Sequence, residues 1–264
     1  MNTGICGIGG RMGCAILRIM VDRGHSLAAA YDAPGSNLIS TNAMNIVNDR
    51  LADCMISVSD ESSLSKTDGV IDFSAPAATM KLIEQALVVK KPLVIGTTGF
   101  SPAEIDVIRN ASLSIPVLFS PNMSLGVNLL FKLTELASSA LTTDYDVEIF
   151  ESHHRFKKDA PSGTAKRLLE IVKENMKGLS SAQTVNGREG ITGERSSNEI
   201  GMHAMRGGNI IGEHTVFFVG MDERIELTHR AADRSTLARG AVAAMEFLKG
   251  KGPGLYSMYD VLGI

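Results

Sequence analysis

The first 120 residues alternate between short apolar runs and longer segments in which apolar residues recur every three or four positions. Short apolar runs bounded by turn residues indicate buried strands, and the three-to-four spacing indicates helices with one buried face. The expected strands are residues 3–8, 27–31, 55–58, 70–73, 93–95 and 117–119, and the expected helices between them are residues 12–22, 77–89 and 102–110. This regular alternation predicts βαβ units around a parallel sheet.

The pattern changes after Asn122. Residues 125–141 and 164–176 are expected to be helices, residues 147–152 a strand that ends at two histidines, and the polar, turn-rich residues 178–197 a loop. Strands at 199–205, 213–219 and 224–229 then follow directly, the last two as a hairpin, before a closing helix at 235–248. Strands in direct succession predict a mixed or antiparallel sheet, so we expect an α/β protein with two domains.

Composition narrows the functional classes without selecting one. Hydrophobic residues make up 44% and charged residues 21% of the 264 residues, which is ordinary for a globular protein. The formal net charge of −3 gives no reason to expect a nucleic acid or an anionic membrane as partner. No apolar run reaches the roughly 18 to 20 residues of a membrane span, and the first residues lack the basic start of a signal peptide. Three cysteines without CxxC spacing argue against disulfides and structural zinc, so a cytoplasmic location is expected.

A glycine-rich turn stands between the first expected strand and the first expected helix, where a dinucleotide-binding turn belongs. Glycine lets the backbone turn tightly and approach a pyrophosphate, and the helix N-terminus stabilises the phosphate charge. The spacing is GxxGxxG, because Met12 takes the third glycine position of the commoner GxGxxG motif. A glycine-rich turn without a ligand is the alternative. The candidate cofactor-binding residues here are Gly7, Ile8, Gly9, Gly10, Arg11, Met12 and Gly13.

Asp32 favours the nucleotide interpretation. It ends the second expected strand, 19 residues past Gly13, where an acidic side chain accepts hydrogen bonds from the adenine ribose hydroxyls. A solvated turn aspartate is the alternative. The next residue, Ala33, supplies no cation for a 2′-phosphate, which Asp32 would also repel. We therefore expect NADH to be preferred over NADPH, with Arg11 as the nearby cation that could soften the preference.

Three further loops follow expected strands, at the edge where open α/β sheets bind ligands. The glycines and hydroxyls of residues 96–99 suit a nicotinamide amide and its ribose, although a tight turn before the helix capped by Ser101 explains them equally well. The candidate cofactor contacts in these loops are Phe73, Gly96, Thr97, Thr98, Ser120, Pro121, Asn122 and Met123.

Five basic side chains precede an expected helix start at residues 161–164; they are His153, His154, Arg155, Lys157 and Lys158. Cations ahead of a helix N-terminus make a receptor for a small, multiply charged acid, and histidines exchange protons near neutral pH. The alternatives are strand-end histidines bonded to backbone and a solvated charged loop. No nearby cysteine or third histidine completes a metal set, so no metal is expected. His203, His214 and His229 are expected to be structural.

Together these motifs resemble one family, the bacterial 4-hydroxy-tetrahydrodipicolinate (dihydrodipicolinate) reductases of the diaminopimelate–lysine pathway. The matching segments are residues 7–13, 70–73, 96–100, 122–128, 151–165, 188–195, 212–215 and 228–234. The resemblance implies NAD(P)H-dependent reduction of a cyclic dicarboxylate to tetrahydrodipicolinate by a homotetramer. It also implies a Rossmann-type dinucleotide-binding domain at residues 1–123 and 236–264, and an α+β domain for substrate binding and tetramerisation at residues 124–235.

The resemblance further implies roles for single residues. His153 matches the family's proposed proton donor, whose pKa a neighbouring cation would lower, and Lys157 matches its second catalytic residue. Substrate-carboxylate contacts are implied for His154, Lys157 and the backbone of Ser162, Gly163 and Thr164, and a contact toward the cofactor for Arg234. Ala33, Ala75 and Met123 depart from residues seen in relatives; the first two bear on cofactor preference and the third on packing at the nicotinamide.

Two other functions share part of this pattern. Another two-domain reductase, such as an amino-acid or aspartate dehydrogenase, would have the glycine turn without needing the basic receptor. A non-catalytic nicotinamide-binding regulator would keep residues 7–32 without a proton donor.

Overall fold

The computed structural model describes residues 1–233 and 235–264. It divides into two compact units, which we call unit 1 (Met1–Leu125 with Ser235–Ile264) and unit 2 (Gly126–Arg234). Among the described helices, none is both long and apolar enough to cross a membrane.

Unit 1 is built on a seven-stranded sheet in which every neighbouring pair of strands is parallel. Its strands are β1 (Asn2–Cys6), β2 (Ser26–Tyr31), β3 (Ile56–Ser57), β4 (Gly69–Asp72), β5 (Leu93–Ile95), β6 (Pro116–Phe119) and β12 (Gly254–Tyr256). The order β3-β2-β1-β4-β5-β6, with β12 beside β6, is that of the Rossmann fold. The predicted parallel sheet is therefore confirmed. Strand β12 was not predicted, because three residues show no pattern.

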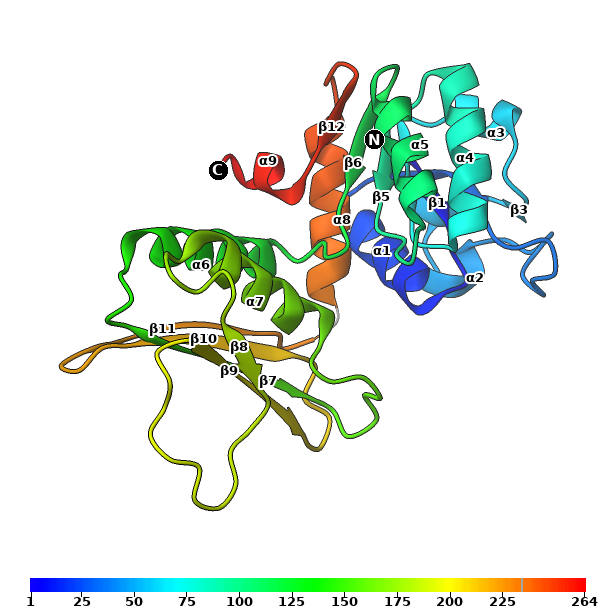
Figure 1. Cartoon of the computed structure of the whole chain (residues 1–264). Helices are drawn as coiled ribbons and strands as arrows, with labels where there is room; N and C mark the ends of the chain where they lie inside the picture. Colours follow the sequence, from blue (N-terminus) through cyan, green and yellow to red (C-terminus); the bar gives the residue numbers. More distant parts are fainter. Residues whose placement is uncertain (234) are drawn as a thin grey trace. The chain divides into compact units, whose positions relative to one another are not determined.

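Helices cover both faces of this sheet (Figure 1). They are α1 (Arg11–Asp22), α2 (Met44–Val47), the 3₁₀ turn η1 (Arg50–Ala52), α3 (Glu61–Ser65), α4 (Pro76–Val89), α5 (Pro102–Ser112), α8 (Ser235–Leu248) and α9 (Met258–Leu262). The longer ones confirm the prediction to within two residues at each end. Helix α5 begins at the expected capping box, in which Ser101 and Glu104 each accept a hydrogen bond from the other's backbone N–H. The short helices were missed because four or five residues carry no clear periodicity.

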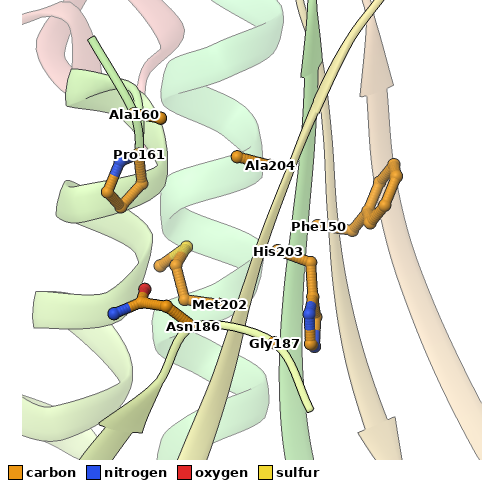
Figure 2. Close-up of a pocket in the computed structure, with 8 residues that line it drawn as sticks. All are labelled: Phe150, Ala160, Pro161, Asn186, Gly187, Met202, His203 and Ala204. Carbon is orange, nitrogen blue, oxygen red and sulfur yellow. The ribbon is translucent and has the colours of Figure 1, made fainter. Parts of the chain in front are cut away.

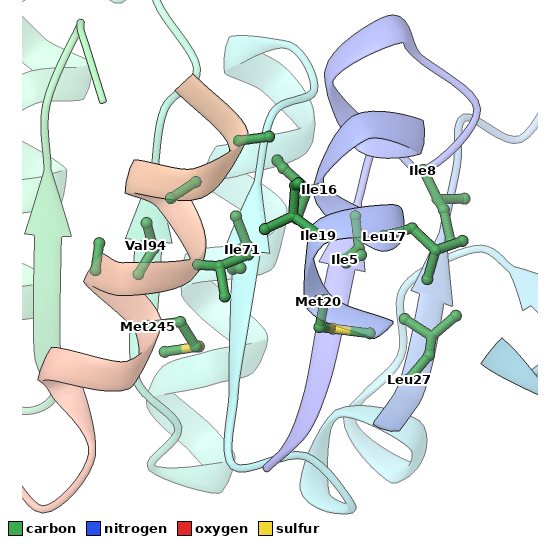
Figure 3. Close-up of a cluster of buried hydrophobic side chains, with 14 of the residues drawn as sticks. Ile5, Ile8, Ile16, Leu17, Ile19, Met20, Leu27, Ile71, Val94 and Met245 are labelled. Atoms are coloured by element: carbon green, nitrogen blue, oxygen red, sulfur yellow. The ribbon is translucent and has the colours of Figure 1, made fainter. Parts of the chain in front are cut away.

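Two apolar clusters hold these layers together. Figure 3 shows the first, in which Ile16 and Ile19 of α1 and Met245 of α8 pack with Ile71 and Val94 of the sheet. The second lies on the other face, where α4 and α5 pack. Because both faces are buried, the strands are continuous apolar runs rather than alternating ones.

Unit 2 is a five-stranded mixed sheet with helices α6 (Leu125–Ala140) and α7 (Gly163–Asn175) on one face (Figure 1). Its strands are β7 (Asp146–His153), β8 (Gln183–Val185), β9 (Glu199–Arg206), β10 (Glu213–Val219) and β11 (Arg224–Arg230). In the order β11-β10-β7-β9-β8, the first two pairings are antiparallel and the last two parallel. The hairpin of β10 and β11 is confirmed. The prediction that residues 178–197 form only a loop was wrong, because β8 pairs within it.

Candidate active site

The glycine turn after β1 leaves no room for larger side chains. Gly7 has a φ of +79°, and a Cβ atom on Gly13 would lie 2.2 Å from the carbonyl oxygen of Gly7. Only glycine accepts both the left-handed backbone and this close approach. The chain therefore enters α1 with its backbone exposed at the turn, as a site for a bulky phosphate group requires.

Hydrogen bonds decide which amides of this turn face outward. The N–H groups of Gly7 and Ile8 both donate to the carbonyl of Tyr31, at 2.9 and 3.1 Å. Both are thus tied to the neighbouring strand β2. Arg11 and Met12 lie in the first turn of α1, whose amides a helix cannot satisfy internally, so their N–H groups can be offered to an anion.

Asp32 lies directly against the glycine turn. A Cβ atom on Gly9 would stand 2.5 Å from Asp32 Oδ2. The carboxylate oxygens accept hydrogen bonds from the Ala33 amide at 2.8 Å and the Ser36 hydroxyl at 3.0 Å. Each oxygen keeps a second lone pair, so the carboxylate can still accept from a ribose hydroxyl.

The loops after β4 and β5 are tied together by Asp72, a fully buried carboxylate. It accepts hydrogen bonds from the hydroxyls of Ser74 and Thr79, both at 2.5 Å, and of Thr97 at 3.1 Å. Thr97 Oγ1 also accepts from the Ser74 amide at 2.9 Å. Burial raises the pKa of Asp72, although the three hydroxyls oppose that rise. The two loops therefore hold a fixed relative position.

Four of the candidate cofactor contacts have buried side chains. Ile8 and Met123 are 0% and 1% exposed and belong to the apolar cluster shown in part in Figure 3, and Thr97 and Ser120 are 4% and 6% exposed. These residues offer a ligand their backbone rather than their side chains. The effect of Met123 on packing at the nicotinamide stays a prediction. Thr98, in contrast, is exposed.

Close contacts also shape the other candidate loop residues of unit 1. A Cβ atom on Gly96 would lie 2.2 Å from the ring of Phe73, so the ring packs directly on the glycine. After β6, the hydroxyl of Ser120 donates to the carbonyl of Asn122 at 2.8 Å, and the intervening Pro121 is exposed.

In unit 2, His153 is the last residue of β7 and is held by Glu151, two residues earlier on the same face. Its Nδ1 atom lies 2.6 Å from Glu151 Oε2. An ionised carboxylate only accepts hydrogen bonds, so Nδ1 carries the hydrogen and Nε2 is the ring nitrogen that remains for chemistry. Gly212 lies beside that nitrogen, since a Cβ atom there would stand 3.1 Å from Nε2.

Glu151 is fully buried and surrounded by donors. Arg206 binds it with two nitrogens, at 2.7 and 2.8 Å, and the Ser162 amide donates to it at 3.1 Å. Burial alone would raise the pKa of Glu151, but the hydrogen bonds from Arg206 and His153 hold that pKa below its usual value. The carboxylate is therefore ionised at neutral pH.

The pKa of His153 is lowered, chiefly by burial. Glu151 opposes this, while Lys157 and Arg206 lower it further. The predicted effect of a neighbouring cation is thus present but secondary. The ring of His214 meets His153 edge-on at 5.3 Å, and burial lowers the pKa of His214 to about 4, so it stays neutral.

Ser162 is the N-cap of helix α7: its side chain accepts a hydrogen bond from the Ala165 amide and pairs with His214 Nε2 at 2.9 Å. The Ser162 amide already donates to Glu151, so it is not available to a substrate, and the backbone contacts of Gly163 and Thr164 stay predictions.

The remaining basic residues divide by exposure. Lys157 is 20% exposed in its side chain and lies 2.8 and 2.9 Å from the two oxygens of Asp159. His154 is half-buried and its ring lies against Phe156. Arg155 and Lys158 are exposed, as expected for the solvated charged loop that was the alternative interpretation. Arg234 lies outside the described residues.

A separate cavity of about 420 Å³ opens in unit 2 where β9 continues past the end of β8 (Figure 2). It is lined by Phe150, Ala160, Pro161, Asn186, Gly187, Met202, His203 and Ala204. Met202 and His203 point to opposite sides of β9 in Figure 2. None of the described candidate site residues lines it, so we do not assign it to the chemistry.

Comparison with known proteins covers both units. Residues 1–123 match the family model "Dihydrodipicolinate reductase, N-terminus", and residues 126–262 match "Dihydrodipicolinate reductase, C-terminus". The chain belongs to the dihydrodipicolinate reductase family. Two curated relatives named 4-hydroxy-tetrahydrodipicolinate reductase, from Thiobacillus denitrificans and Geobacter metallireducens, are 45% and 44% identical to it over 100% of the chain and 99% of their own length. The chain is accordingly an oxidoreductase.

A solved structure supports the fold of this reductase. The dipicolinate-bound dihydrodipicolinate reductase from Paenisporosarcina sp. TG-14 matches it with a TM-score of 0.76 at 22% identity, covering 98% of both chains. At that identity the likeness shows a shared fold.

Sequence reasoning missed Glu151, Arg206 and Asp72, which hold the candidate site residues in place. Glu151 had a usable signal, because its spacing of two from His153 places both on one face of a strand. Arg206 had none, since only the parallel pairing of β7 with β9 brings it opposite His153. Asp72 had no signal either, because it stands at the end of an apolar strand with no neighbouring motif.

Proposed function

We propose that this reductase converts 4-hydroxy-tetrahydrodipicolinate to tetrahydrodipicolinate with NAD(P)H, the reduction step of diaminopimelate and lysine biosynthesis. The observation that carries the proposal is the cluster in unit 2. There, a carboxylate-held histidine stands with Lys157 and the N-terminus of α7, in a chain 45% identical to a named reductase of that substrate. Unit 1 supplies the glycine turn that fits a dinucleotide.

A bound nicotinamide supplies a hydride. The chain's own residues then stabilise the developing charge and deliver the proton. The hydride leaves negative charge on the conjugated ring, and fixed cations and N–H donors near that charge lower the barrier. Lys157 is the candidate cation, and its ammonium group must leave Asp159 to bind a substrate carboxylate. The first-turn amides of α7 bind a carboxylate through the helix dipole.

His153 completes the reaction by delivering one proton from Nε2. The added hydride and proton together account for the two electrons and two hydrogens gained by the ring. If the hydroxylated form binds, loss of water precedes these additions. General acid catalysis of this kind typically contributes about 10²–10⁴-fold to the rate.

The preference for NADH is part of the proposal. Asp32 lies against the glycine turn and accepts hydrogen bonds, whereas Ala33 offers no cation to a 2′-phosphate. We expect kcat/KM to be higher with NADH than with NADPH. Comparable values would remove this part of the proposal and leave the reaction intact.

A homotetramer and a cytoplasmic location are also proposed. The helix-free face of the unit 2 sheet carries half-buried Phe150 and Phe217 and the 42% exposed Met205, an apolar surface suited to association. Sedimentation velocity tests the assembly. The three unpaired cysteines are compatible with a reducing compartment.

The test of the function is oxidation of NADH by the purified protein with freshly generated 4-hydroxy-tetrahydrodipicolinate. Turnover with this substrate, and no reduction of NAD⁺ when aspartate or another amino acid is supplied, supports the proposal. Reduction of NAD⁺ by aspartate instead would identify an amino-acid dehydrogenase, and NADH binding without any turnover would identify a regulator.

A further inference from the structure

We infer that Glu151 is a positioning residue for the reduction: it fixes His153 in the tautomer with hydrogen on Nδ1, so that Nε2 alone exchanges the proton. Arg206 and the Ser162 amide in turn fix Glu151. The expected effect on turnover rests on the proposed function, whereas the expected tautomer of His153 does not.

The hydrogen bonds of Glu151 leave it no other role. Oε2 accepts from His153 Nδ1 at 2.6 Å and Arg206 Nη1 at 2.8 Å. Oε1 accepts from Arg206 Nη2 at 2.7 Å and the Ser162 amide at 3.1 Å. A carboxylate offers about four lone-pair sites, and all are used. Glu151 therefore has no acceptor site left for a substrate and acts on the reaction through the groups that it holds, of which His153 is the one that exchanges a proton.

The partners of Glu151 come from three separate segments, so its position is strongly determined. His153 shares β7, Arg206 ends β9, and Ser162 is the N-cap of α7. The buried carboxylate thus aligns the histidine with the helix N-terminus proposed to bind the substrate. Burying a charge is costly, and replacing a buried ion pair with apolar side chains often leaves a protein equally stable. Stability alone is therefore a weak reason for the Glu151–Arg206 pair.

A second carboxylate on β7 provides a matched control. Glu148 lies 2.6 Å from His203 Nε2 and is bound by Arg188 and Arg195, so it repeats the combination of histidine and arginine. It points to the opposite face of the sheet, because it is three residues from Glu151. Loss of Glu148 should affect stability without touching His153.

The charged and titratable groups described around His153 are Glu151 on its own strand, Lys157 in the following loop, Arg206 on β9 and His214 on β10. Burial and the two cations lower the pKa of His153, and Glu151 opposes them. Removing the Glu151 charge should therefore lower this pKa further. It should also release the ring to adopt the tautomer with hydrogen on Nε2.

The experiment compares Glu151→Gln, the double variant Glu151→Gln with Arg206→Met, and Glu148→Gln. The double variant removes both charges, so it remains informative if Arg206 without a partner prevents the single variant from folding. Nitrogen-15 NMR of the imidazole rings, assigned with His153→Gln, reports the tautomer and pKa of His153. Kinetics with the proposed substrate and NADH report kcat, KM and their pH dependence.

In the wild type we expect the Nδ1–H tautomer. In the folded Glu151 variants we expect a tautomer mixture, a lower His153 pKa and a kcat about 10²-fold lower near neutral pH, within the range that general acid catalysis supplies. KM for NADH should change little. The acid form of His153 is lost as pH rises through its pKa, so the descending limb of the pH profile should move to lower pH. Glu148→Gln should leave these His153 signals and the pH profile unchanged.

An unchanged His153 tautomer in the folded double variant overturns the inference, as does a shifted tautomer with unchanged kcat. If the wild type fails to reduce the proposed substrate, the proposed function fails by itself. The NMR comparison still decides whether Glu151 fixes the histidine.

Discussion

The two units hold their buried carboxylates in opposite ways. Asp72 in unit 1 is surrounded by hydroxyl donors, and its pKa is raised by burial. Glu151 in unit 2 is bound by an arginine, and its pKa is lowered despite burial. Unit 1 positions its loops with hydroxyl donors, and its proposed phosphate contacts are backbone N–H groups. Unit 2 instead fixes charged side chains, because its proposed chemistry requires a proton at a defined atom.

The largest expected effect falls on the charged side chains of unit 2. Replacing His153 with glutamine should lower kcat by about 10²–10⁴-fold, because the proton donor is removed while the ring's neighbours remain. NADH binding should barely change. Steady-state kinetics and fluorescence titration of NADH check this, and near-normal turnover would contradict the assignment of His153.

Lys157 should show a smaller effect, and on substrate binding as well as turnover. A hydrogen bond to a charged group contributes about 1.5–3 kcal/mol, so Lys157→Ala should raise the substrate KM by roughly tenfold to a hundredfold and also lower kcat. Lys166→Ala, on the exposed side of α7, serves as the control. An unchanged KM and kcat would remove Lys157 from the site.

The glycine turn of unit 1 is expected to be sensitive to added side-chain volume rather than to loss of charge. In Gly13→Ala the new methyl would meet the Gly7 carbonyl at 2.2 Å, and such overpacking costs about 1–3 kcal/mol. We expect NADH binding to weaken by about tenfold or more. Gly35→Ala is the matched control, because its Cβ would meet open space. Equal NADH affinity in the two variants would contradict the role of the turn.

The smallest effect concerns acid stability. The pKa of Glu148 is lowered from 4.5 to about 2: burial would raise it, but Arg188, His203 and Arg195 outweigh burial. A depressed folded-state pKa gives stability that is present above 4.5 and lost as pH falls toward 2. The melting temperature of wild type should therefore fall across that window, and Glu148→Gln should reduce the slope. An identical slope in both proteins would show that Glu148 is not responsible.

Much of unit 1 could be predicted because its signals are local. The glycine spacing, the capping box at Ser101 and the apolar runs each depend on neighbouring residues, and the parallel sheet followed from them. Strand β8 could not be predicted in this way, since three polar residues become a strand only by pairing with β9.

The candidate site divides along the same line. The sequence by itself predicted a basic cluster ahead of the start of α7 from residue type and spacing, and the family resemblance proposed His153 and Lys157 within it as the catalytic residues. Only the tertiary structure revealed that Arg206 clamps Glu151, that the Ser162 amide is already used and that Thr97 faces inward. Hydrogen bonds between residues up to 55 positions apart depend on strand register and burial, which no local pattern encodes.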